Sequence, residues 1–205
     1  AQVLINEVMH RPSTALNTCD QSMVNPGTPS CGKEYVELYN TNLCTSVDIS
    51  CYILASKTGS TIGGAFVFPS GIIIPPNGHL VIGSPNASAN PLSVDIVLAN
   101  YLSTNNLCVE SNRWFLENSD GWVGLYSPTG NVIDAIYWTF TAGQPNNLYT
   151  NSAFDFSPCL PAGACNAVTL KKPNLMTVGT EINYMGEYTT QNLTFSRIND
   201  GGAWQ

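Results

Sequence analysis

The chain has 205 residues, of which only 10% are charged, and its formal net charge at pH 7 is −7. A chain of this length suits one all-β domain that buries about 70% of its unfolded surface, so it needs no metal or partner to fold. Its seven Lys and Arg residues form no basic stripe, which argues against nucleic-acid binding, and it contains no apolar run near the ~20 residues that cross a bilayer.

The first quarter of the chain predicts three strands. Residues 3–10 (VLINEVMH) alternate between two rows of side chains, and residues 34–40 (EYVELYN) do the same. Turn-forming residues at 41–48 then lead into an apolar run at 51–55. We therefore predict that residues 34–40 and 51–55 pair as a hairpin, and that residues 11–33, rich in Pro, Asn, Ser and Thr, form a long loop.

Further short apolar runs, bounded by Gly, Pro, Asn and Ser, predict the remaining strands. They lie at residues 66–68, 71–74, 79–83, 121–126, 132–139 and 193–198, with weaker patterns at 168–170 and 182–188. Residues 94–98 fit a strand or a helical turn, and residues 99–113 and 140–166 look irregular. Roughly nine or ten short strands with little helix predict a β-sandwich or barrel.

The seven cysteines indicate an oxidising compartment. Proximity along the chain predicts three bridges that each close a short polar loop: Cys19–Cys31, Cys44–Cys51 and Cys159–Cys165. Cys108 is then left over, either as a buried inert thiol or as a link to another chain. Because the sequence contains no Cys-x-x-Cys and neither histidine has a thiol nearby, it predicts no zinc site.

Charged residues interrupt apolar rows at four positions: Glu7, Glu37, Asp134 and Arg197. A buried lone charge is costly, so such groups are normally paired or coordinated. One interpretation is a structural ion pair in which Arg197 lies over Glu7 or Glu37 and ties the edge strands together. The other is a cation site made from Glu7, Glu37, Asp134 and Asp200, whose oxygen ligands would suit calcium. The sequence predicts no other cofactor.

Catalytic patterns are absent from the sequence. Gly-x-Ser-x-Gly, His-Glu-x-x-His and a phosphate-binding glycine loop do not occur. His10 and His79 have no nucleophile or orienting acid next to them in the sequence, so we interpret both as ordinary surface residues. Trp122 and Trp138 lie inside predicted strands, where core packing is expected rather than stacking on a sugar.

Several segments occur together in an order that is typical of one family. They are residues 5–9 (INEVM), 34–40, 47–54 (VDISCYIL), 66–84 (FVFPSGIIIPPNGHLVIGS), 121–138 (GWVGLYSPTGNVIDAIYW) and 195–204 (FSRINDGGAW). This series closely resembles the lamin-tail domain in its secreted bacterial form. The resemblance implies an immunoglobulin-like β-sandwich without catalytic residues, as a single domain over residues 1–205. Long bridged loops at about 11–33 and 140–191 depart from the family, so a function particular to this chain is expected there.

The resemblance and the cysteines lead to an expected function by analogy. We expect a non-enzymatic structural or protein-interaction module of a bacterial secreted or cell-surface protein, such as an adhesin or an envelope-assembly component. Its partner would be another protein or a neighbouring domain of a larger polypeptide, with no nucleic acid and no membrane insertion. The alternative is a carbohydrate- or calcium-binding module attached to a secreted hydrolase. A strand that begins directly after Ala1-Gln2 fits an end left by signal-peptide cleavage.

Overall fold

The computed structural model describes residues 2–11, 23–24, 34–57, 63–84, 93–109, 114, 116, 121–139, 165, 179–183 and 193–197. Within these residues the protein is all-β apart from one short 3-10 helix, η2 (Leu98–Tyr101). The strands are β1 (Val3–Arg11), β2 (Tyr35–Asn40), β3 (Val47–Asp48), β4 (Ile53–Lys57), β5 (Gly63–Val67), β6 (Ile73–Ile74), β7 (His79–Gly83), β8 (Ile96–Val97), β9 (Leu107–Val109), β10 (Gly121–Tyr126), β11 (Val132–Thr139), β12 (Gly179–Asn183) and β13 (Leu193–Ser196).

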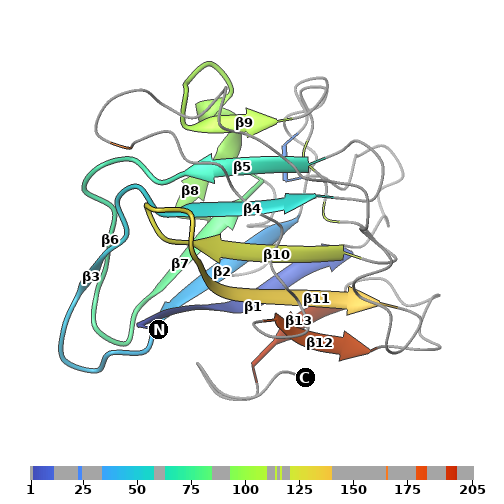
Figure 1. Ribbon diagram of the computed structural model, residues 1–205, viewed down its shortest axis with the longest axis horizontal. Helices are drawn as coiled ribbons and strands as arrows, with labels where there is room; N and C mark the ends of the chain where they lie inside the picture. The colour runs from blue at the N-terminus through green and yellow to red at the C-terminus, as the bar shows by residue number, and fades with distance from the viewer. Residues whose placement is uncertain are drawn as a thin grey trace.

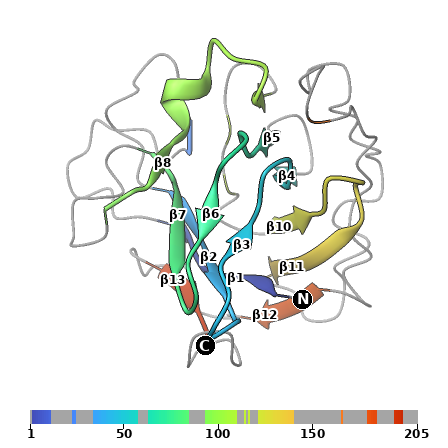
Figure 2. The same cartoon turned by 90° about the vertical axis from the view of Figure 1, so that its left-hand side faces the viewer.

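The strands build two facing sheets. The five-stranded sheet has the order β13-β1-β2-β7-β8, and the six-stranded sheet has the order β12-β11-β10-β4-β5-β9. Neighbouring strands are antiparallel except in the pairs β7–β8 and β11–β12. The two layers are seen one in front of the other in Figure 1 and side by side in Figure 2. This arrangement confirms the predicted β-sandwich.

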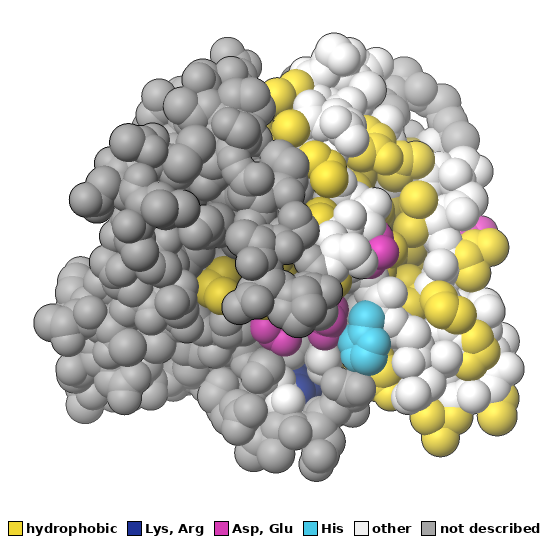
Figure 3. Space-filling model, turned by 180° about the vertical axis from the view of Figure 1, so that it is seen from behind, with side chains coloured by type: hydrophobic (Ala, Val, Ile, Leu, Met, Phe, Trp, Pro, Cys, Tyr) yellow, Lys and Arg dark blue, Asp and Glu magenta, His cyan; other side chains and the backbone are white. Residues whose placement is uncertain are grey.

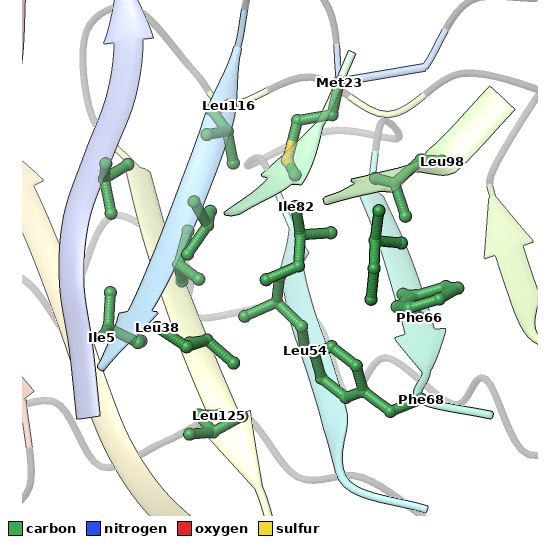
Figure 4. Packing of buried hydrophobic residues seen from close by; sticks show 14 of the residues in the cluster. Ile5, Met23, Leu38, Leu54, Phe66, Phe68, Ile82, Leu98, Leu116 and Leu125 are labelled. Carbon is green, nitrogen blue, oxygen red and sulfur yellow. The ribbon is translucent and has the colours of Figure 1, made fainter. Parts of the chain in front are cut away.

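The core lies between the sheets and is built from the alternating side chains that the sequence shows. Leu38 of β2 faces Leu54 of β4 and Leu125 of β10, and all three are fully buried. Figure 4 shows these side chains converging from both layers, together with Phe66 and Ile82. Because each fully buried side chain of this size stabilises the fold by roughly 1.5–3 kcal/mol, this core is the main source of stability.

A second buried apolar cluster lies on the other face of the six-stranded sheet. Its largest members are Trp122 and Tyr126 of β10 and Tyr137 of β11. The predicted core position of Trp122 is thereby confirmed, and Trp138 is likewise buried, in the cluster between the sheets. Cys165 packs against this second cluster. The six-stranded sheet is therefore buried on both faces, whereas antiparallel sheets commonly leave one face exposed to solvent.

The predicted hairpin between residues 34–40 and 51–55 is wrong, because its two strands belong to different sheets. β2 pairs with β1 and β7, whereas β4 pairs with β5 and β10. The intervening β3 pairs with β6 in a two-stranded cap ribbon, residues 41–50 and 71–78, that crosses one end of the sandwich (Figure 2). Its buried side chains, Val47, Ile49 and Ile74, enter the core.

Asn40 holds the cap ribbon to the end of β2. Its side chain is fully buried, and Nδ2 donates to the carbonyl oxygens of Thr45 (2.9 Å), Ile74 (3.1 Å) and Pro75 (2.9 Å). Its Oδ1 accepts from the backbone N–H of Asn42 at 2.9 Å. The side-chain amide of Asn40 therefore hydrogen-bonds backbone groups on both segments of the ribbon. An apolar residue at this position would leave those groups without these bonds.

The structure overturns two of the three predicted disulfides. Cys51 is joined to Cys165, 114 residues away, so neither Cys44–Cys51 nor Cys159–Cys165 forms. Cys44 is a free, exposed thiol. Cys108 is disulfide-bonded, so the predictions of an inert thiol and of a leftover cysteine are wrong. The predicted Cys19–Cys31 bridge lies outside the described residues.

Two predicted irregular regions contain packed structure. Residues 99–113 include β9, which pairs with β5 at the edge of the six-stranded sheet. Within the predicted loop 11–33, Met23 and Val24 are buried, and both of their N–H groups approach the carbonyl oxygen of Trp114. Residues 94–98 combine both expected states, since β8 runs directly into η2.

Candidate functional site

The outer face of the five-stranded sheet carries two of the four predicted charges. Glu7 of β1 and Glu37 of β2 are directly paired across the strands, as Glu7↔Glu37. Alternation along β2 places Tyr35 and Tyr39 on the same face as Glu37. Glu37 is only 6% exposed, and Glu7 is partly buried. The register of β1 against β2 thus places two carboxylates next to each other in a largely buried position.

Each carboxylate has a neutral hydrogen-bond donor. The hydroxyl of Tyr35 donates to Oε1 of Glu7, and the amide of Asn6 donates to Oε1 of Glu37 at 2.8 Å. Nε2 of His79 lies 4.0 Å from Oε1 of Glu37, and the His79 ring stacks on Tyr39 with centroids 4.8 Å apart. His79 is a surface residue, as predicted, and Figure 3 shows a histidine beside acidic side chains on this face.

Burial controls the titration of Glu7. Loss of hydration raises the pKa of the Glu7 carboxyl, and the neighbouring Glu37 raises it further. The Tyr35 hydroxyl and His79 lower this pKa but do not cancel the increase. Glu7 therefore keeps a proton at higher pH than an ordinary glutamate does.

Arg197 does not pair with Glu7 or Glu37, so the predicted partners of the ion pair are wrong. Its terminal nitrogen lies 3.1 Å from Oδ2 of Asp134, and both side chains are only 10% exposed. Its Nε donates to the carbonyl oxygen of Ile5 at 2.9 Å. The pair joins β11 of one sheet to β1 of the other, because Asp134 shares the inward face of β11 with Ile136 and Trp138.

A bulge in β1 explains why the pair forms there. The register with β2 shifts between Ile5 and Glu7, which frees backbone groups from the ladder. The N–H of Ile5 donates to Oδ2 of Asp134 at 2.9 Å, and the carbonyl of Asn6 accepts from the backbone N–H of Arg197 at 3.0 Å. Burial raises the pKa of Asp134, although the Ile5 N–H and Arg197 oppose this increase.

Among the acidic candidates that the structure describes, Asp134 lies apart from Glu7 and Glu37. Asp134 is bound to Arg197 between the sheets, whereas Glu7 and Glu37 lie on the outer face. Among the described residues, no three Asp, Glu, His or Cys side chains are grouped so that they could hold a metal. The fourth candidate, Asp200, lies outside the described residues. The arrangement that the structure does show is a set of hydrogen-bonded structural contacts.

His10 is not a surface residue, contrary to the prediction. It is fully buried, and its ring lies 5.0 Å from that of Trp138, at an angle of 46°. The alternating pattern of β1 contained the signal, since His10 shares a row with Val8, which is also fully buried. Packing against an indole gives His10 a core role.

The cap ribbon carries exposed apolar side chains that the sequence reasoning missed. Leu43 is 72% exposed and Ile73 is 56% exposed, and they are the large hydrophobic residues that the described part of the chain leaves open to solvent. Cys44, the exposed thiol, directly follows Leu43. The signal for Ile73 lies in the run Ile72-Ile73-Ile74, of which alternation allows only one face to enter the core.

Comparison with known proteins gives one family. The model of the Lamin Tail Domain matches residues 1–140, which is about two thirds of the chain. No curated protein matches the chain. In the part of the chain that the structure describes, no helix is long and apolar enough to cross a membrane.

Proposed function

The chain belongs to the lamin tail domain family, a family of non-catalytic β-sandwich modules, and on this premise we propose that it is a non-enzymatic structural or protein-interaction module. The proposal extends to its setting, a bacterial secreted or cell-surface protein such as an adhesin or an envelope-assembly component. The disulfides at Cys51–Cys165 and at Cys108 support an oxidising compartment.

The exposure of Leu43 and Ile73 on the cap ribbon carries the proposal. Removing exposed apolar side chains from water is favourable, and two large ones on one ribbon support contact with another protein surface. The ribbon is suited to this role because Asn40 and the buried Val47 and Ile74 hold it firmly against the sandwich. The expected partner is a protein, or a neighbouring domain of a longer polypeptide. The carbohydrate-binding alternative stays a prediction.

We also infer that residues 1–205 act as one domain. β12 and β13 lie beyond the residues matched by the family, yet β12 extends one sheet next to β11 and β13 extends the other next to β1. The Cys51–Cys165 disulfide adds a covalent link between the matched and the unmatched parts.

Site-specific photo-crosslinking in the producing cell tests the interaction. A photoreactive amino acid at position 43 or 73 is expected to give a discrete crosslinked protein, and the same probe at Thr104, which is exposed on another part of the surface, is expected to give none. The double substitution Leu43→Ser/Ile73→Ser should weaken a crosslink formed from position 42. Equal crosslinking from positions 43 and 104, or none from either ribbon position, would contradict the proposal.

The location can be tested with the free thiol. A membrane-impermeant maleimide should label intact producing cells, and Cys44→Ser should remove most of the labelling. If labelling requires cell lysis, the chain is not exposed on the surface.

A further inference from the structure

The two carboxylates on the outer face of the five-stranded sheet form an unfavourable pair when both are charged. Directly opposed residues on antiparallel strands have Cβ atoms roughly 4.5–5.5 Å apart, and like charges in such positions destabilise the pairing. Glu7 and Glu37 occupy these positions on β1 and β2. Glu37 is 6% exposed, so water and salt screen the repulsion only weakly.

The described neighbours do not neutralise this charge. On β2 the facing titratable groups are Tyr35 and Tyr39, whose hydroxyl groups supply no positive charge. On β7 the facing group is His79, 4.0 Å from Glu37 and positively charged only when protonated. Next to β13, the positively charged side chain that the structure describes is Arg197. Its terminal nitrogen is hydrogen-bonded to Asp134.

A single added proton relieves the repulsion. A protonated Glu7 still accepts from the Tyr35 hydroxyl through its carbonyl oxygen, and its own O–H becomes a donor next to Glu37. Glu7 takes up this proton as the pH falls, and the uptake favours the folded sheet.

We propose that Glu7 and Glu37 form a proton-linked pair that strengthens the pairing of β1 with β2 in acidic surroundings. The pair makes the attachment of the N-terminal strand, and with it the stability of the module, respond to pH. This property is separate from partner binding by the cap ribbon.

The raised pKa of Glu7 gives the sign and the pH range. The folded chain binds this proton more tightly than the unfolded chain, for which the ordinary glutamate value is 4.5. The stability that the proton contributes is therefore fully present below that value and is lost as the pH rises through the raised pKa of Glu7. Acidification from neutral pH thus stabilises the module through this group.

The thermal midpoint of the full chain, measured between about pH 4 and pH 8, tests the proposal. Glu7→Gln keeps the shape and an acceptor for Tyr35 but cannot gain or lose the proton. As the pH falls, wild type should gain thermal midpoint relative to Glu7→Gln, because only wild type can take up the proton at this position. The matched control is Asp48→Asn at an exposed carboxylate, which should leave that gain in place.

A second measurement isolates the pair from general acid effects. Carbon NMR of the Glu7 carboxyl should give a titration midpoint above that of an ordinary glutamate, and Glu37→Gln should lower this midpoint. The second readout decides the question even if Glu7→Gln does not fold. A Glu7→Gln profile parallel to wild type, an equal flattening in Asp48→Asn, or a Glu7 midpoint unchanged by Glu37→Gln would overturn the proposal.

Discussion

Replacing Arg197 by methionine should cost the protein about 3 kcal/mol of unfolding free energy at neutral pH. The substitution removes the bond from Nε to the Ile5 carbonyl (2.9 Å) and the contact with Asp134 (3.1 Å). It leaves the Asp134 carboxylate, whose side chain is only 10% exposed, without its cation. The loss stays at the lower end of the range for broken buried pairs, because the N–H groups of Ile5 and Ala135 still bind Asp134 at 2.9 and 3.0 Å.

The pH dependence of this loss follows from the same geometry. Arg197 lowers the pKa of Asp134 in the folded protein, so its removal raises that pKa further. Protonation of Asp134 then removes the uncompensated charge, and the difference between Arg197→Met and wild type should shrink as the pH falls through the raised pKa of Asp134.

Urea unfolding at neutral and acidic pH measures both effects. Asp134→Asn/Arg197→Met should recover about half of the loss at neutral pH, since no charge is then buried alone, and Asp134→Asn completes the double-mutant cycle. A loss below about 1 kcal/mol for Arg197→Met, or a loss independent of pH, would show that the pair does not hold the two sheets together.

Three further changes test other contacts. Asn40→Leu should destabilise the protein by about 3 kcal/mol in urea unfolding, because the carbonyl oxygens served by its amide lose their donor inside the fold. Gly64→Ala should lower the thermal midpoint, since a Cβ there would collide with the ring of Trp114; an unchanged midpoint would mean that the indole can move. Reducing Cys51–Cys165, which spans 114 residues, should cost up to about 4 kcal/mol, and an identical midpoint with and without reductant would refute this role.

The elements that sequence reasoning found correctly are those with a local signal. β1, β7 and the hairpin of β10 with β11 lie where the alternating patterns predicted them. β9 was missed because its three residues are too few to show a period of two.

The sequence patterns did not show which of these strands pair with one another. β2 and β4 lie close in sequence but join different sheets, because the segment between them forms the cap ribbon that Asn40 holds in place. A period of two identifies a strand and its faces, but it carries no information on which strand lies beside it.

For the residues of the candidate site, too, the sequence indicated which residues matter but not which of them meet. The sequence placed Glu37 on one face with Tyr35 and Tyr39, and it identified Asp134 and Arg197 as charges in apolar rows. It could not show that Asp134 and Arg197 meet, because that contact depends on a bulge in β1, far from both in the chain.

The sequence by itself determined the all-β class, the two faces of most strands and the need of the buried charges for partners, because these follow from side-chain order over a few residues. Only the tertiary structure decided that Cys51 bonds Cys165, that Arg197 bonds Asp134 and that Glu7 opposes Glu37. The physical reason is that each of these pairs joins segments whose distance in space is fixed by the packing of the whole sandwich.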